Sequence, residues 1–72
     1  MMPKFKLDPL SIGKKLRDLR GDKEQKIVAD DVGISVSALS MYENGERIPR
    51  DEIKIALSEY YGTTVGALFF TY

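Results

Sequence analysis

Residues 25–44 read QKIVADDVGISVSALSMYEN, and their pattern is the most informative in the chain about its fold. Apolar residues recur at helical spacing on both sides of Gly33. Glycine readily takes the left-handed backbone conformation that ends a helix, and Ala29 is small enough to let a second helix cross the first closely. The apolar residues placed to fix the crossing angle are Val28, Ile34 and Leu39. The stretch therefore predicts two short helices joined by a tight turn.

The flanking sequence predicts three further helices, so the expected fold class is all-α. The residues expected to begin the five helices are Asp8 with Pro9, Glu24, Ser35, Pro49 and Thr64, and those expected to end the first four are Gly21, Gly33, Asn44 with Gly45, and Gly62. Ile12, Leu16 and Leu19 recur on one face of the first helix, which we expect to face the core. We expect residues 1–8 to form an arm, extended or disordered, and residues 9–72 to form one domain.

The composition excludes several classes of function. The chain of 72 residues holds no cysteine and no histidine, which removes thiolate metal sites and the commonest general base. No nucleophile–base pair, phosphate-binding loop or calcium loop is visible, so we expect no enzyme activity, no cofactor and no metal. No apolar run approaches the length of a membrane span, and the N-terminus does not read as a signal peptide.

The charges are unevenly distributed along the chain although the formal net charge is +0. Residues 1–26 carry eight basic and four acidic side chains, whereas residues 27–72 carry three basic and seven acidic ones. Two interpretations stay open: a basic face that meets phosphate, with the acidic part turned away, or an ordinary mixed surface with chance segregation.

At this point the sequence resembles a known family. The run with Gln25, Ala29, Gly33-Ile34-Ser35 and then Leu39-Ser40-Met41-Tyr42-Glu43-Asn44-Gly45 is similar to the Xre-type, or phage repressor/Cro-like, helix-turn-helix family. The similarity extends from about Ile12 to Phe69. It implies a compact five-helix bundle of the phage repressor type, with the motif at about 25–44. It also implies a bacterial, cytoplasmic transcriptional regulator from a phage or mobile element, which binds double-stranded DNA.

The resemblance implies a role for individual residues. Base-facing positions would be Val36, Ser37 and Met41 on the helix that enters the major groove. Contacts to the DNA backbone would come from Gln25, Lys26, Ser40, Asn44, Arg47 and Arg50. Arg20 and Glu43 would form a structural ion pair between the first and third helices.

The chain departs from the family pattern at the base-facing positions. Relatives often carry Gln, Arg or Lys there, whereas neither Val36, Ser37 nor Met41 can make a bidentate contact to a base. Valine can touch a thymine methyl group, and serine donates or accepts with little selectivity. We therefore expect weak direct readout, or readout through DNA shape and the N-terminal arm with Lys4 and Lys6.

The chain end is rich in aromatic residues, and its role has two interpretations. Phe70 and Tyr72 either form a surface for a second copy of the chain, giving a homodimer on a palindromic site, or cover one open side of the core. The function also has an alternative: an Xre-like protein-interaction module, such as an antitoxin, favoured by base-facing positions that carry no basic side chain.

Overall fold

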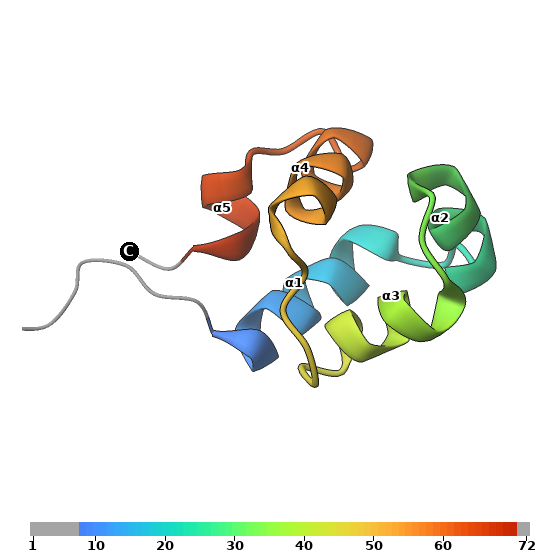
Figure 1. Cartoon of the computed structure of the whole chain (residues 1–72), viewed down its shortest axis with the longest axis horizontal. Helices are drawn as coiled ribbons and strands as arrows, with labels where there is room; N and C mark the ends of the chain where they lie inside the picture. The colour runs from blue at the N-terminus through green and yellow to red at the C-terminus, as the bar shows by residue number, and fades with distance from the viewer. Residues whose placement is uncertain (1–7, 71–72) are drawn as a thin grey trace, which may run out of the picture.

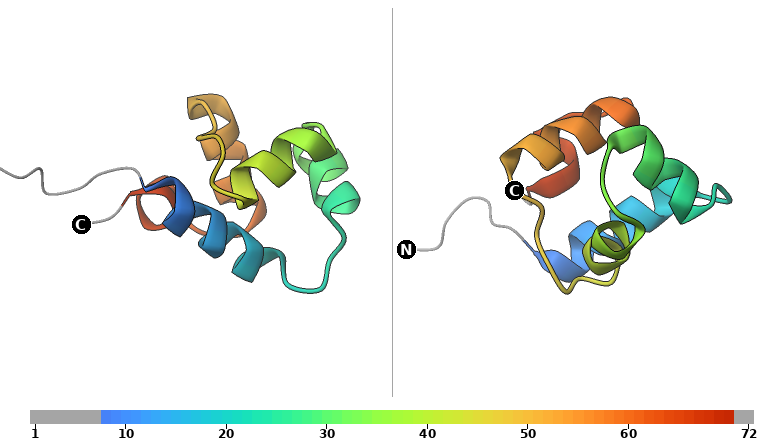
Figure 2. Two further views of the ribbon diagram at one scale, coloured as in Figure 1. Left: turned by 90° about the horizontal axis from the view of Figure 1, so that it is seen from below. Right: turned by 45° about the vertical axis from the view of Figure 1, so that its right-hand side comes forward.

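The computed structural model describes residues 8–70, which form five helices around one core (Figure 1). Their bounds are α1 Pro9–Arg20, α2 Gln25–Val32, α3 Val36–Glu43, α4 Asp51–Tyr60 and α5 Val65–Phe69. α1 contacts α3 and α5, while α2 packs against α3 and α4. Figure 2 shows α2 and α3 meeting at an angle through a short turn. The predicted all-α, five-helix fold is confirmed. None of the helices within residues 8–70 has the length and hydrophobicity that a bilayer-spanning segment requires.

Side chains cap three of the helices at the residues that the sequence predicts. The hydrogen bonds run from the N–H of Ser11 to Asp8 Oδ1 at 3.4 Å, from that of Ala38 to Ser35 Oγ at 3.0 Å, and from that of Ala67 to Thr64 Oγ1 at 3.0 Å. Each bond satisfies a backbone N–H group that a helix N-terminus leaves without an intrahelical partner. Glu24 starts α2 without such a side-chain bond.

Gly33 makes the turn between α2 and α3. Its φ of 89° lies in the left-handed region, and its N–H donates to the carbonyl of Ala29 at 2.8 Å. No atom lies within 4 Å of where a Cβ would stand, so the backbone conformation, and not space, requires glycine.

α4 begins near Pro49, as the sequence predicts. The helix starts at Asp51 with Arg50 as its N-cap, two residues beyond Pro49. Pro49 is buried and belongs to the connection from α3. Asp51 and Glu52 lie in the first turn of α4, where the helix dipole favours negative charge.

The core combines side chains from all five helices. Its buried hydrophobic residues are Ile12, Leu16, Val28, Ala29, Leu39, Tyr42, Leu57, Leu68 and Phe69, and Ile34 from the turn packs against them. Leu19 was expected on the same face as Ile12 and Leu16, but it is 44% exposed. That prediction is wrong because Leu19 lies in the last turn of α1, and periodicity gives the direction of a side chain without showing that a neighbour covers it.

Gly13 allows α1 and α3 to approach closely. A Cβ built on Gly13 would lie 2.3 Å from the carbonyl oxygen of Glu43 and 3.0 Å from that of Tyr42. Both contacts are to backbone, which cannot swing aside as a flexible side chain does. The C-terminal turn of α3 can therefore lie this close to α1 only because residue 13 is a glycine and has no side chain.

Candidate nucleic-acid interface

The side of α3 that faces away from the core carries the residues predicted to face bases. The buried residues of α3 are Leu39, Tyr42 and Glu43. With 3.6 residues per turn, Ser37 and Met41 lie on the opposite side, one above the other. Val36 and Ser37 are exposed, and Met41 is half-buried. The structure thus brings Ser37 and Met41 to one accessible side of α3, while Val36 is exposed at the first position of the helix.

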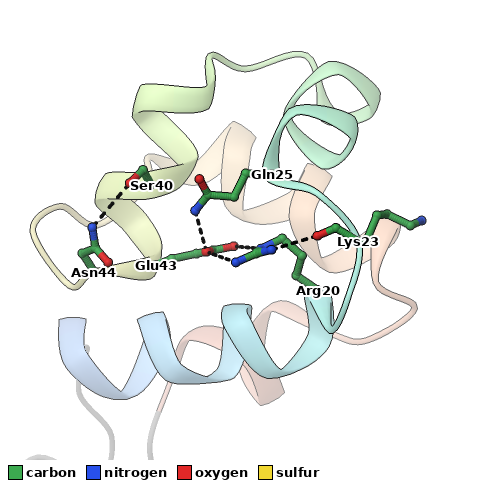
Figure 3. A network of polar contacts seen from close by, with 6 residues as sticks. All are labelled: Arg20, Lys23, Gln25, Ser40, Glu43 and Asn44. Atoms are coloured by element: carbon green, nitrogen blue, oxygen red, sulfur yellow. Dashed lines mark hydrogen bonds and ion pairs between the residues drawn. The ribbon is translucent and has the colours of Figure 1, made fainter.

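Glu43, on the core side of α3, is the centre of a polar network that joins three helices (Figure 3). Its side chain is 1% exposed. Arg20 of α1 donates from Nε to Oε2 at 2.7 Å and from Nη2 to Oε1 at 2.9 Å, and Gln25 of α2 donates from Nε2 to Oε1 at 2.8 Å. Such bidentate, charge-assisted bonds offset the cost of burying a carboxylate. The structure therefore brings Arg20 and Glu43 together, and it adds Gln25.

The ion pair with Glu43 also shifts the pKa of Arg20. Hydrogen bonding to Glu43 raises the pKa of the Arg20 guanidinium above its usual value, and this effect outweighs partial burial, which lowers it. Arg20 Nη1 also donates to the backbone carbonyl of Lys23 at 2.8 Å. The same side chain thus holds α3 and the loop between α1 and α2.

Gln25 is predicted to contact a phosphate, but here its amide nitrogen faces Glu43 (Figure 3). The amide carries two N–H groups, so one remains available for a second acceptor. The backbone N–H groups of Gln25 and Lys26 precede those of Ile27 and Val28, which donate to the carbonyl of Glu24. The first turn of α2 can therefore still offer donors to a phosphate.

The acidic side chains of α2 are both engaged by neighbours. Asp30 pairs with Lys26 at 3.1 Å, one turn earlier and in solvent. Asp31 accepts from the hydroxyl of Tyr60 on α4 at 2.9 Å, and Lys23 Nζ donates to that hydroxyl at 3.0 Å. Asp31 is thus directed toward α4. Sequence reasoning missed this bridge because its members lie up to 37 residues apart.

Removing the side-chain hydroxyl should affect the free energy of unfolding differently at the neighbouring residues Tyr60 and Tyr61. Tyr60 bridges Lys23 and Asp31, so Tyr60→Phe should lower the free energy of unfolding, by less than about 1 kcal/mol because the bridge is exposed. The Tyr61 hydroxyl is buried and makes no hydrogen bond within residues 8–70, and burial raises its pKa to about 12. Tyr61→Phe should leave stability unchanged or raise it by up to about 1 kcal/mol.

Urea unfolding of the two variants beside the parent checks this pair of outcomes. Each variant keeps its ring and hence the edge-to-face contact between the two rings, whose centroids lie 5.1 Å apart. A larger loss for Tyr61→Phe than for Tyr60→Phe would contradict the bonding described here.

The remaining predicted backbone contacts follow α3 in sequence. Asn44 Nδ2 donates to Ser40 Oγ at 3.4 Å, which is a weak bond between exposed groups. Arg47 and Arg50 are exposed and line a hollow of about 240 Å³. Tyr42, Ile48 and Ile53 complete its lining, and none of these five residues is acidic. The hollow is thus lined by two cationic side chains, of which Arg50 also pairs with Glu52 at 3.9 Å.

Of the two interpretations of the aromatic chain end, a dimer surface or a cover over the core, the second describes Phe70. Phe70 is half-buried and packs against the core, with Lys54 Nζ 5.7 Å from the centre of its ring. None of the strongly exposed large apolar residues among residues 8–70 is aromatic. Tyr72 lies outside the described residues, as do Lys4 and Lys6 of the predicted arm.

The helix-turn-helix family matches residues 14–68. The chain belongs to this family, as an Xre-type helix-turn-helix domain of the DNA-binding transcriptional regulator class. No curated protein sequence matches it.

Three solved structures illustrate the likeness. The P22 c2 repressor in complex with a synthetic operator is 28% identical, with 81% of this chain and 91% of that chain covered and a TM-score of 0.77. The restriction-modification controller protein C.AhdI from Aeromonas hydrophila is 26% identical, with 86% and 97% covered and a TM-score of 0.77. Apo-HppE is 22% identical, with 86% of this chain but 36% of that chain covered and a TM-score of 0.75, a likeness of fold alone.

Proposed function

We propose that the protein is a small transcriptional regulator that binds double-stranded DNA sequence-specifically, with α3 in the major groove. The observation that carries this proposal is the contrast between the two sides of α3. Glu43 fixes its inner side to α1 and α2, whereas Ser37 and Met41 lie outside that network. Because its inner side is fixed to α1 and α2, α3 can enter a major groove without changing its position in the domain. The operator bound to the P22 c2 repressor supports the proposal by likeness.

Contacts to phosphate would position α3 on the duplex. We assign them to the two ends of the motif: Gln25 and Lys26 at the start of α2, and Ser40, Asn44, Arg47 and Arg50 at and beyond the end of α3. Arg47 and Arg50 are exposed and line the hollow. They suit this role because one guanidinium group can donate two parallel hydrogen bonds to two oxygens of a phosphate.

The regulator would act as a homodimer in the bacterial cytoplasm, and its origin would be a phage or mobile element. Two copies related by a two-fold axis would place their α3 helices in successive major grooves, about 34 Å apart. Association would also stabilise so small a domain. The proposal includes no catalytic step and no cofactor.

A second candidate function is a protein-interaction module, such as an antitoxin. The observation that favours it is the absence of a basic side chain at positions 36, 37 and 41, together with a formal net charge of +0. Such a module would bind a stoichiometric protein partner and show no affinity for DNA.

The salt dependence of DNA binding tests the proposal. Labelled duplexes of random sequence should bind at low ionic strength and be released as salt rises, because phosphate contacts displace counterions. Arg47→Ala should reduce the slope of log affinity against log salt by about 1. Lys14→Ala, which removes a basic residue of α1 assigned to no DNA contact, should leave the slope nearly unchanged. The absence of any salt-dependent binding would reject the proposal, and co-purification of a stoichiometric protein would favour the second candidate.

A further inference from the structure

The accessible part of α3 presents the apolar side chains of Val36 and Met41 and the hydroxyl of Ser37, which makes no side-chain hydrogen bond within residues 8–70. Val36 is 41% exposed, and Met41 is half-buried on the side that faces solvent. In the helical arrangement Ser37 lies between them. From this we infer that α3 reads the C5-methyl groups of pyrimidines in the major groove, an inference that rests on the proposed DNA-binding function.

The neighbouring polar groups each make one contact within the protein, and the proposed function assigns Gln25, Lys26, Ser40 and Asn44 to the DNA backbone instead of to base edges. Ser35 Oγ caps α3 by accepting the N–H of Ala38, and Ser40 Oγ accepts from Asn44. Gln25 donates to Glu43, and Lys26 pairs with Asp30. This leaves the hydroxyl of Ser37 as the polar side chain on this side of α3 that no described hydrogen bond occupies. One hydroxyl distinguishes the four base pairs poorly.

The two apolar side chains discriminate where the hydroxyl does not. In the major groove, guanine and adenine present hydrogen-bonding atoms, and unmodified cytosine presents an amino group. Thymine presents a methyl group at C5, and 5-methylcytosine carries the same group at the same position. A methyl group against Val36 or Met41 gains apolar burial, whereas a polar edge there loses water without gaining a partner. The ligand chemistry is therefore a C5-methyl group, from either of these two pyrimidines.

Base analogues that lack only the methyl group test the inference. The probe is the duplex that the full chain binds most tightly in a selection from random DNA, with its thymines replaced by deoxyuridine one at a time. We expect about fourfold weaker binding for each contacted methyl group removed, the equivalent of one buried CH₂ group. Changing a contacted T·A pair to C·G should weaken binding, and 5-methylation of that cytosine should recover about fourfold. The deoxyuridine duplexes thus test the methyl group of thymine, and the methylated C·G duplexes test that of 5-methylcytosine.

Variants of the protein show whether α3 is responsible for the difference. Val36→Thr keeps the branched shape but exchanges a methyl group for a hydroxyl, and Met41→Gln exchanges the thioether for an amide. Each should abolish the loss caused by deoxyuridine at its own contacted position. Ile55→Thr is the matched control, because Ile55 is a β-branched residue 50% exposed on α4, and it should leave the loss unchanged.

The outcomes separate this inference from the function on which it rests. Binding that is insensitive to the methyl group, or a sensitivity that persists in both α3 variants, would overturn the inference while leaving DNA binding in place. A selection that returns no bound duplex would overturn the proposed function and this inference with it.

Discussion

Replacing Glu43 with alanine should lower the free energy of unfolding by about 3 kcal/mol, the lower end of what breaking a buried ion pair costs. The variant leaves Arg20, whose side chain is 19% exposed, without its main partner, and it leaves the Gln25 amide without its acceptor. A cavity replaces the carboxylate at the junction of three helices. For a domain of this size, whose total stability is on the order of 5 kcal/mol, the loss would remove most of the margin.

Urea unfolding followed by circular dichroism at neutral pH measures this loss, and two further variants define its origin. Arg20→Ala should also destabilise strongly, because it leaves the Glu43 carboxylate buried with Gln25 as its partner. Ser37→Ala, on the opposite side of the same helix, should change stability by less than about 0.5 kcal/mol. Equal losses for Glu43→Ala and Ser37→Ala would mean that α3 is oriented differently from the structure described here.

Gly13→Ala should destabilise the protein, although the same change in an exposed helix stabilises it. Alanine is favoured over glycine inside a helix by about 1 kcal/mol, so helix propensity alone predicts a gain. Here the new methyl group would meet the carbonyl oxygen of Glu43 at 2.3 Å. Separating α1 from α3 to relieve this overlap disturbs the packing beneath Leu39 and the Glu43 network, and we expect a net loss of about 2 kcal/mol.

Thermal and urea unfolding of Gly13→Ala beside Arg17→Ala would check the reversal of sign. Arg17 is an exposed residue of the same helix, so its replacement should have a small effect. A Gly13→Ala variant as stable as the parent, or more so, would show that α1 and α3 do not approach as closely as described.

The sequence predicts the helix ends and the motif well because both depend on local chemistry. Asp8, Ser35 and Thr64 cap helices through their own side chains, and Gly33 ends α2 through its own backbone freedom. The family resemblance supplied the pairing of Arg20 with Glu43, which no local spacing indicates. The register of α3 follows from Leu39 and Tyr42, whose spacing places one side in the core.

The features that the sequence did not predict depend on contacts between distant residues. Gly13 reads as a weak point within a helix until the carbonyl groups of α3 are placed beside it. The bond from Gln25 to Glu43 and the bridge through Tyr60 join residues separated by 18 and by 29 or more positions. Leu19 follows the apolar periodicity of α1, yet no neighbouring element covers its side chain.

The division of α3 into an anchored side and a free side has a consequence for how this protein can evolve. Substitutions at positions 36, 37 and 41 change the chemistry offered to a binding target without disturbing Glu43, so they carry little folding cost. Lineages descended from such a chain can therefore diverge in target one residue at a time while their scaffold stays fixed. Gly13 and Glu43 cannot vary in the same way, because a change at either residue disturbs the packing of α3 on α1 that every new specificity requires.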